Sequence, residues 1–135
     1  MNEIKFNVPL QIRESTTNVK NFLNSKLPPH GPGKNILSIQ REVNKKFNFK
    51  DVFLTNSCTS ALEICSYLLN IKKGDEIIFS NYTYVTTANS FVSKGAVPKF
   101  ADIRSDTLNI DEKKIIRLIN KKTKAIVVNH YGSIS

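Results

Sequence analysis

Residues 74–101 read GDEIIFSNYTYVTTANSFVSKGAVPKFA, a run in which strand and helix patterns alternate. Residues 76–79 are a short apolar run typical of a buried strand, and residues 97–101 form a second run of this kind. Between them, residues 85–93 have helical spacing and end at Gly95, because glycine commonly terminates a helix. A strand, a helix and a second strand in this order predict a parallel unit with a right-handed crossover.

The alternation continues on both sides of this unit. Residues 52–55 predict an earlier strand, and residues 59–70 predict the helix that follows it. Residues 111–120 predict a helix with acidic residues in its first turn, where they suit the helix dipole, and residues 124–129 predict a further strand. We therefore expect an α/β fold with a mostly parallel sheet flanked by helices. Since the chain ends directly after a strand, we expect the sheet to be incomplete.

The amino-terminal part has a different character. The first thirty-five residues lack sustained periodicity, with one short helix expected over residues 15–27. They end in the run PPHGPG at residues 28–33, which no helix can cross. From Ile36 the apolar residues recur at helical spacing. The sequence thus predicts an N-terminal arm at 1–35 and one incomplete α/β domain at 36–135.

Length and composition limit the possible classes of protein. A chain of 135 residues with 40% hydrophobic residues has room for one globular domain. Its longest apolar runs, such as residues 125–128, are far shorter than the roughly 20 residues that cross a bilayer. The first residues lack the apolar segment of a secretory signal, which predicts a cytoplasmic protein. Cys58 and Cys65 have no metal-binding spacing, so we expect free thiols and no metal site.

The net charge of +9 raises the possibility of nucleic-acid binding. The excess of positive charge lies in residues 1–50 and 112–135, whereas residues 51–111 are net negative. Sixteen of the twenty cations are lysines, scattered among fifteen asparagines, and no run exceeds two adjacent cations. A compositional bias explains this pattern better than a dedicated site does. A basic nucleic-acid-binding domain therefore stays an alternative only.

Residues 55–63 read TNSCTSALE and join the first predicted strand to the next helix. Ligands of open α/β sheets bind at the carboxyl ends of the strands. Small hydroxyl residues at a helix start offer amides and hydroxyl groups to an anion, and this segment contains no Lys or Arg. It therefore predicts a phosphate site formed by amides, hydroxyls and the helix dipole. The alternative is a plain capping box, because Ser60-x-x-Glu63 matches that pattern.

Further candidates follow the other predicted strands. Tyr82 and Tyr84 come after the second strand, where they can stack on a planar ring, although half-buried aromatics at the edge of a core are the simpler interpretation. Asp102 and Arg104 end the third strand, and His130 follows the fourth. A single histidine in such a place is more often structural than functional.

Taken together, these segments resemble the successive N-terminal motifs of the DegT/DnrJ/EryC1/StrS sugar aminotransferases. The likeness covers nearly the whole chain, is strongest over 52–132, and keeps both order and spacing. The motifs are Thr55-Asn-Ser-Cys-Thr-Ser-Ala-Leu-Glu63, Gly74-Asp-Glu-Ile-Ile78, Tyr82-Thr-Tyr-Val-Thr-Thr-Ala-Asn-Ser-Phe91, Gly95-Ala96, Asp102-Ile-Arg-Ser-Asp-Thr-Leu-Asn-Ile-Asp111, Thr123-Lys-Ala-Ile126 and His130-Tyr131-Gly132.

The resemblance implies part of the large domain of a fold-type-I enzyme that uses pyridoxal 5′-phosphate. Such enzymes transfer an amino group from glutamate to the 4-keto carbon of a nucleotide-linked 6-deoxysugar for cell-surface polysaccharides, and they work as homodimers. By this resemblance, Thr59 and Ser60 match the positions that hold the cofactor phosphate. Tyr84 matches the aromatic residue that stacks on the pyridine ring, where many members carry Phe or Trp.

The resemblance assigns no catalytic residue to this chain. The lysine that binds the cofactor covalently, and the aspartate that pairs with the pyridine nitrogen, belong to motifs downstream of residues 130–131. None of the sixteen lysines stands at a matching position. We therefore expect an N-terminal fragment of a sugar aminotransferase that does not catalyse alone. A non-catalytic remnant that pairs with a full-length relative is the alternative within the same family.

Overall fold

A computed structural model describes residues 12–25 and 33–131 of the chain. The chain divides into two compact units, Met1–Leu54 and Thr55–Ser135. The first eleven residues, most of the proline- and glycine-rich run, and Gly132 of the last motif lie outside the described residues.

In its described residues, 12–25 and 33–54, the first unit contains two helices, each close to its prediction. Helix α1 spans Arg13–Asn24, and helix α2 spans Lys34–Phe47. Helix α2 ends at Asn48, which has the left-handed conformation with φ of 54°. Asparagine tolerates this conformation better than most residues do, so it is a suitable residue for a helix end.

The strand predicted at residues 52–55 is wrong, because no strand forms there. The Val52 carbonyl accepts a hydrogen bond from Gln40 Nε2 at 2.7 Å, and Phe53 is 83% exposed. Strand-forming residue types reflect packing on a pleated surface, and without a neighbouring strand they do not form one.

The second unit is built on a three-stranded parallel sheet. Its strands are β1 (Glu76–Ser80), β2 (Val97–Ala101) and β3 (Thr123–Val127), in the order β2-β1-β3. Both neighbours of β1 run parallel to it. This arrangement confirms the predicted α/β class, and it brings the carboxyl ends of all three strands to one edge of the sheet.

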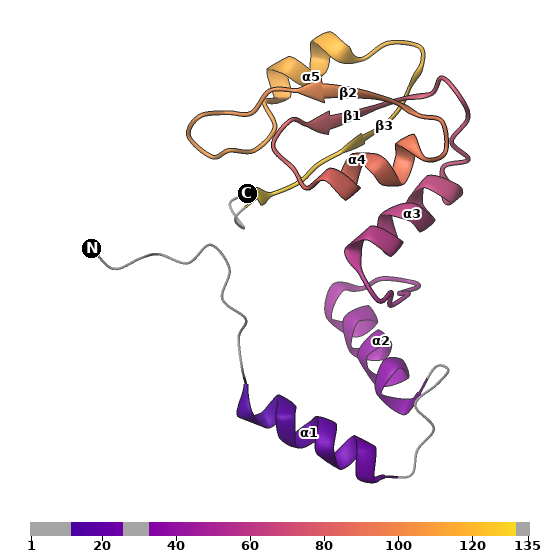
Figure 1. Ribbon diagram of the computed structural model, residues 1–135, viewed down its shortest axis with the longest axis vertical. Coiled ribbons are helices and arrows are strands. Elements are labelled where there is room, and N and C mark those ends of the chain that lie inside the picture. Colours follow the sequence, from indigo (N-terminus) through magenta and orange to yellow (C-terminus); the bar gives the residue numbers. More distant parts are fainter. Residues whose placement is uncertain (1–11, 26–32, 132–135) are drawn as a thin grey trace. The chain divides into compact units, whose positions relative to one another are not determined.

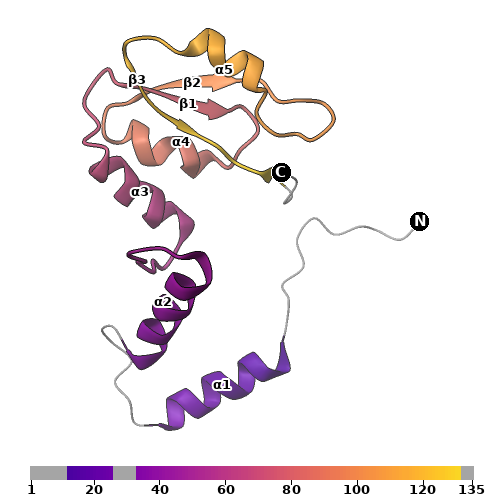
Figure 2. The same ribbon diagram turned by 180° about the vertical axis from the view of Figure 1, so that it is seen from behind.

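Helices cover both faces of this sheet. They are α4 (Val85–Val92) and α5 (Glu112–Leu118), while α3 (Cys58–Leu68) packs mainly against α4. Two opposite views show α4 on one face and α5 on the other (Figures 1 and 2). Central strand β1 is consequently buried along its whole length, which explains its nearly continuous apolar sequence.

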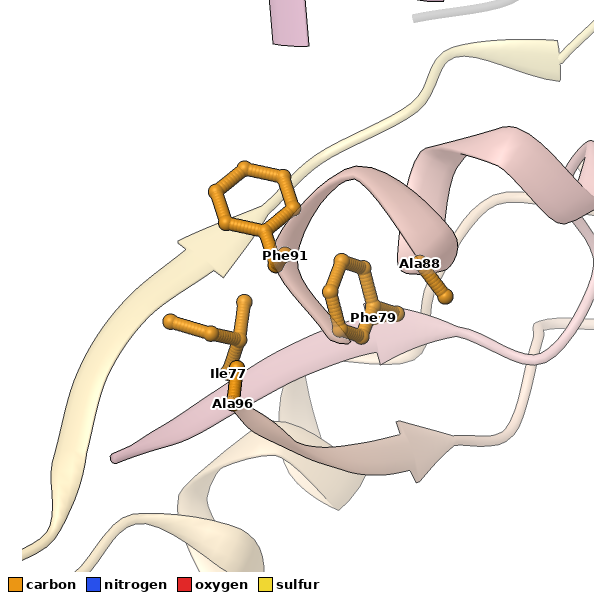
Figure 3. Packing of buried hydrophobic residues seen from close by; sticks show 5 residues of the cluster. All are labelled: Ile77, Phe79, Ala88, Phe91 and Ala96. Carbon is orange, nitrogen blue, oxygen red and sulfur yellow. The ribbon is translucent and has the colours of Figure 1, made fainter. Parts of the chain in front are cut away.

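Alternation along β1 divides its side chains between two cores. Ile77 and Phe79 pack with Ala88 and Phe91 of α4, as Figure 3 shows. The Phe79 and Phe91 rings meet edge to face, with their centroids 5.7 Å apart. On the other face, Ile78 packs in a cluster that includes residues of α5. The carboxyl end of β1 is thus fixed from both sides.

The turn after α4 depends on a glycine, although not in the predicted way. The helix ends at Val92, with Ser93 as its C-cap, and Gly95 lies two residues further along. Gly95 has φ of +95°, and a Cβ atom there would lie 3.0 Å from Lys73 Cα. Its carbonyl accepts a hydrogen bond from the Gly74 amide at 3.0 Å. Gly95 therefore allows the close approach that places β2 beside β1.

Candidate functional site

Helix α3 begins one residue earlier than predicted, with Ser57 as its N-cap. The Ser57 hydroxyl oxygen accepts a hydrogen bond from the Ser60 amide at 3.1 Å. The predicted capping box at Ser60 and Glu63 is therefore wrong, because Ser60 is already the third residue of the helix. A helix that starts at Cys58 leaves the Thr59 amide without an intrahelical acceptor.

The two predicted phosphate residues thus offer different groups. Thr59 has its amide at the open end of the helix. Ser60 has its amide engaged by Ser57, but its hydroxyl accepts the Ser57 hydroxyl proton at 3.0 Å and keeps its own proton to donate. A small anion at this end of α3 would meet one amide, one hydroxyl and the positive end of the helix dipole.

The start of α4 lies beside the start of α3. Thr59 Oγ1 donates a hydrogen bond to Thr86 Oγ1 at 3.1 Å, although the two residues are 27 positions apart in the sequence. Tyr84 is the N-cap of α4, and its side chain is 71% exposed. The starts of α3 and α4 therefore bring together an open helix amide, hydroxyl groups and an exposed aromatic ring.

Tyr84 is an unusual residue for a helix start. Its side chain forms no capping hydrogen bond. Ser, Thr, Asp or Asn at an N-cap stabilises a helix by about 1 kcal/mol over a residue that cannot cap. This helix start is therefore not explained by its local sequence, and such departures are expected at functional sites.

The segment after β3 reaches the same edge. Asn129 Nδ2 donates a hydrogen bond to Thr83 Oγ1 at 3.1 Å, and Thr83 Oγ1 donates to Thr87 Oγ1 at 3.1 Å. The Tyr82 and Tyr131 rings lie 4.4 Å apart between their centroids. The sequence predicted a role for Tyr82 but not these contacts. Its only local signal is that polar side chains directly follow two neighbouring strands.

The remaining candidates take other roles. Arg104 forms ion pairs with Asp106 at 2.7 Å and with Glu112 at 3.4 Å. The hydrogen bond from Arg104 lowers the pKa of Asp106 to about 2, and the same contact raises the pKa of Arg104. Asp102 accepts a hydrogen bond from Asn81. These groups stabilise the loop before α5 and leave Arg104 already paired.

Cys58 and Cys65 are both free thiols, as predicted, and both are exposed. Within the described part of the chain, no three His, Cys, Asp or Glu side chains gather as a metal site would require. None of the described helices combines the length and the apolar character needed to cross a membrane.

Comparisons with known proteins point to the same family as the sequence motifs do. The model of the DegT/DnrJ/EryC1/StrS aminotransferase family matches residues 9–135. The spore coat polysaccharide biosynthesis protein SpsC of Bacillus subtilis (strain 168) is 35% identical over 132 residues, which cover 98% of this chain and 33% of the relative.

Solved structures give the same picture. Helicobacter pylori PseC, an aminotransferase involved in the biosynthesis of pseudoaminic acid, superposes with a TM-score of 0.81 at 33% identity, covering 99% of this chain and 36% of that one. The PLP-form of a sugar aminotransferase described as putative from Streptococcus pneumoniae superposes with a TM-score of 0.78 at 29% identity, covering 93% and 31%. The chain spans about a third of the length of each of these relatives.

Proposed function

Because the chain belongs to the DegT/DnrJ/EryC1/StrS aminotransferase family, we propose that it contributes the phosphate-binding and ring-stacking part of a sugar aminotransferase site. Pyridoxal 5′-phosphate is the cofactor of this family and is present in a solved relative. One observation carries the proposal: the 3.1 Å hydrogen bond between Thr59 and Thr86, which joins two helix starts next to the exposed Tyr84.

The residues present fit this cofactor. Its phosphate matches the Thr59 amide and the Ser60 hydroxyl at the start of α3, where the helix dipole favours an anion. Its flat pyridine ring matches Tyr84, whose 71% exposure leaves the aromatic ring accessible for stacking. In this proposal, Thr59, Ser60 and Tyr84 are cofactor-binding residues.

These residues bind and orient. When bound, the cofactor supplies the electron sink through which an amino group passes between an amino acid and a carbonyl carbon. Thr59 and Ser60 fix the phosphate, and Tyr84 fixes the plane of the ring. We assign no proton transfer to the described residues, and no lysine of this chain receives a catalytic role.

For the whole enzyme, we propose transfer of the amino group of glutamate to a nucleotide-linked 4-keto-6-deoxysugar in cell-surface polysaccharide biosynthesis. The names of two relatives support this proposal. One is a spore coat polysaccharide biosynthesis protein, and the other is an aminotransferase involved in the biosynthesis of pseudoaminic acid. The motifs resemble those of dTDP-4-amino-4,6-dideoxygalactose transaminase in particular. The 4-keto sugar of that reaction is therefore the first substrate to test.

Three further assignments accompany this proposal. The full enzyme is a homodimer, as the family resemblance implies. Its location is the cytoplasm, which agrees with two free thiols exposed to solvent. Residues 1–35 act as an arm, and residues 36–135 form part of the large domain.

The cofactor site is tested by titrating the ¹⁵N-labelled chain with pyridoxamine 5′-phosphate. This compound has the phosphate and the ring but lacks the aldehyde, which would react with any of the sixteen lysines. We expect shifts of the Thr59 and Ser60 amide signals, and weaker binding in Thr59→Val and Ser60→Ala. Thr16→Val and Ser105→Ala, which change exposed residues elsewhere, are the matched controls. Shifts that are spread over lysine-rich segments and spare α3 would contradict the proposal.

A further inference from the structure

The conformation of Tyr84 depends on contacts from outside its own helix. Its side chain does not cap α4, although its carbonyl accepts a hydrogen bond from the Thr87 amide at 2.9 Å. We use the name Tyr84 turn for residues 82–87, which join β1 to α4. Because the Tyr84 side chain adds no capping hydrogen bond to this turn, contacts from neighbouring segments contribute to its restraint.

One side of the Tyr84 turn is held by α3 and the other by the segment after β3. On the first side, Thr59 donates its hydroxyl proton to Thr86. On the second side, Asn129 donates to Thr83 from 46 positions away, and the Tyr82 ring packs against Tyr131. Thr83 directly precedes Tyr84, and Thr86 directly follows the first residue of α4. Their two hydrogen bonds therefore restrain the backbone on both sides of the tyrosine.

The contact from Asn129 has a defined direction. Its amide nitrogen can only donate, so the Thr83 hydroxyl is the acceptor. A hydroxyl group has a single proton, and Thr83 uses it toward Thr87. The chain of donors therefore runs from Asn129 through Thr83 to Thr87. A carboxylate at position 129 cannot start this chain, because it has no proton to donate.

We propose that Asn129 is a positioning residue for the ring of the cofactor. Through Thr83 and Thr87 it fixes the Tyr84 turn, and thereby the aromatic face on which the pyridine ring stacks. This inference rests on the proposed function, because it gives Asn129 a role at the same site. It does not extend to the phosphate, which is held at α3 by Thr59 and Ser60.

The ligand-free protein provides the first test. In Asn129→Ala and in the nearly isosteric Asn129→Asp, we expect the Thr87 amide to exchange with solvent about fivefold faster, since one hydrogen bond contributes about that factor to local stability. Asn89→Ala, at an exposed position on α4, is the matched control and should leave this exchange unchanged. Unchanged exchange in both Asn129 variants, at intact overall stability, would overturn the proposal.

The second test separates ring from phosphate. The variants at Asn129 should weaken pyridoxamine 5′-phosphate between about two- and twelvefold, the range of an aromatic stacking contact. They should leave the affinity for inorganic phosphate unchanged. A purely structural defect would weaken both ligands, and equal losses would therefore contradict the positioning role.

Variants of the acceptor show whether Asn129 acts through Thr83. Thr83→Ser keeps the hydroxyl and should behave like the unchanged protein. Thr83→Val should show effects at least as large as those of Asn129→Ala, because it removes both the bond from Asn129 and the bond to Thr87. The double variant Asn129→Ala/Thr83→Val should be no worse than Thr83→Val alone, because Thr83→Val already removes the contact that Asn129→Ala breaks. Additive losses would show two independent effects and would overturn the proposed path.

The two proposals fail in different ways. If the unchanged chain binds no pyridoxamine 5′-phosphate, the proposed cofactor site fails, while faster Thr87 exchange in the Asn129 variants still supports the restraint of the Tyr84 turn. If the unchanged chain binds this ligand but Asn129→Ala binds it equally well, the cofactor site stands and the positioning role of Asn129 is refuted.

Discussion

Replacing Tyr84 by alanine separates binding from folding at the candidate site. The side chain is 71% exposed and forms no capping hydrogen bond. Changes at such surface positions usually alter the free energy of unfolding by less than about 0.5 kcal/mol. Alanine is also a poor N-cap residue, so the start of α4 changes little. We therefore expect Tyr84→Ala to fold with nearly unchanged stability.

The effect on binding should be larger. An aromatic stacking pair contributes about 0.5–1.5 kcal/mol beyond buried area, which corresponds to a two- to twelvefold change in Kd. We expect Tyr84→Ala to bind pyridoxamine 5′-phosphate more weakly by this factor, and to bind inorganic phosphate as before. Tyr84→Phe keeps the aromatic face and should bind both ligands normally.

Three measurements on each protein decide the matter: the Kd of pyridoxamine 5′-phosphate, the Kd of phosphate and the midpoint of urea unfolding. Unchanged affinity for pyridoxamine 5′-phosphate in Tyr84→Ala would remove this residue from the site. Equal weakening in Tyr84→Phe and Tyr84→Ala would mean that the hydroxyl matters and the ring face does not. Loss of phosphate affinity together with a lower urea midpoint would indicate a folding defect.

Three further predictions concern the fold and the charge. The hydrogen bond from Asn120, with support from Lys99, lowers the pKa of Glu76, so its stabilising effect is complete above pH 4.5 and is lost as the pH falls through the lowered value. In Glu76→Gln, thermal unfolding followed from pH 7 to pH 3 should show a smaller loss of Tm than in the unchanged protein. Gly74 and Gly95 have nearly equal φ of +92° and +95°, but only a Cβ at Gly95 would meet backbone atoms. Urea unfolding should show a loss of about 1–2 kcal/mol in Gly74→Ala from the backbone alone, and a larger loss in Gly95→Ala; equal losses would refute the close approach. Duplex DNA should bind no better than the non-specific range, Kd about 10⁻⁴ to 10⁻⁶ M at physiological salt by fluorescence anisotropy, and a sequence-selective nanomolar complex would revive the nucleic-acid alternative.

Local sequence patterns predicted the described elements of the second unit well. Strands at 76–79 and 97–101 and the helices after them were found because period and chain order carry this information. The prediction of a strand at 52–55 was wrong because local sequence does not carry all the information that a strand requires. Its residue types favour a strand, but a strand also needs a neighbour, and the sequence of one segment does not show whether a neighbour is present.

The candidate site likewise contains residues that the sequence predicted and contacts that it did not predict. Thr59, Ser60 and Tyr84 were predicted because each directly follows a strand-like run or matches a family motif. The partnership of Asn129 with Thr83 was not, because 46 residues separate them and no periodicity connects them. Contacts of this kind depend on the order of strands in the sheet, which becomes known only when β3 is placed next to β1.

The electrostatics of the candidate site follow from the absence of positively charged side chains at the start of α3. The chain has a net charge of +9, yet residues 55–63 contain no cation. A phosphate at α3 would therefore be held by an amide and a helix dipole, which point in fixed directions, and by a hydroxyl on a short side chain. A lysine would supply a stronger but mobile charge, with three rotatable donors on a flexible stem. In the proposed site, fixed donors would orient the phosphate as well as bind it, and an oriented phosphate would let one tyrosine at the next helix start define the plane of the ring.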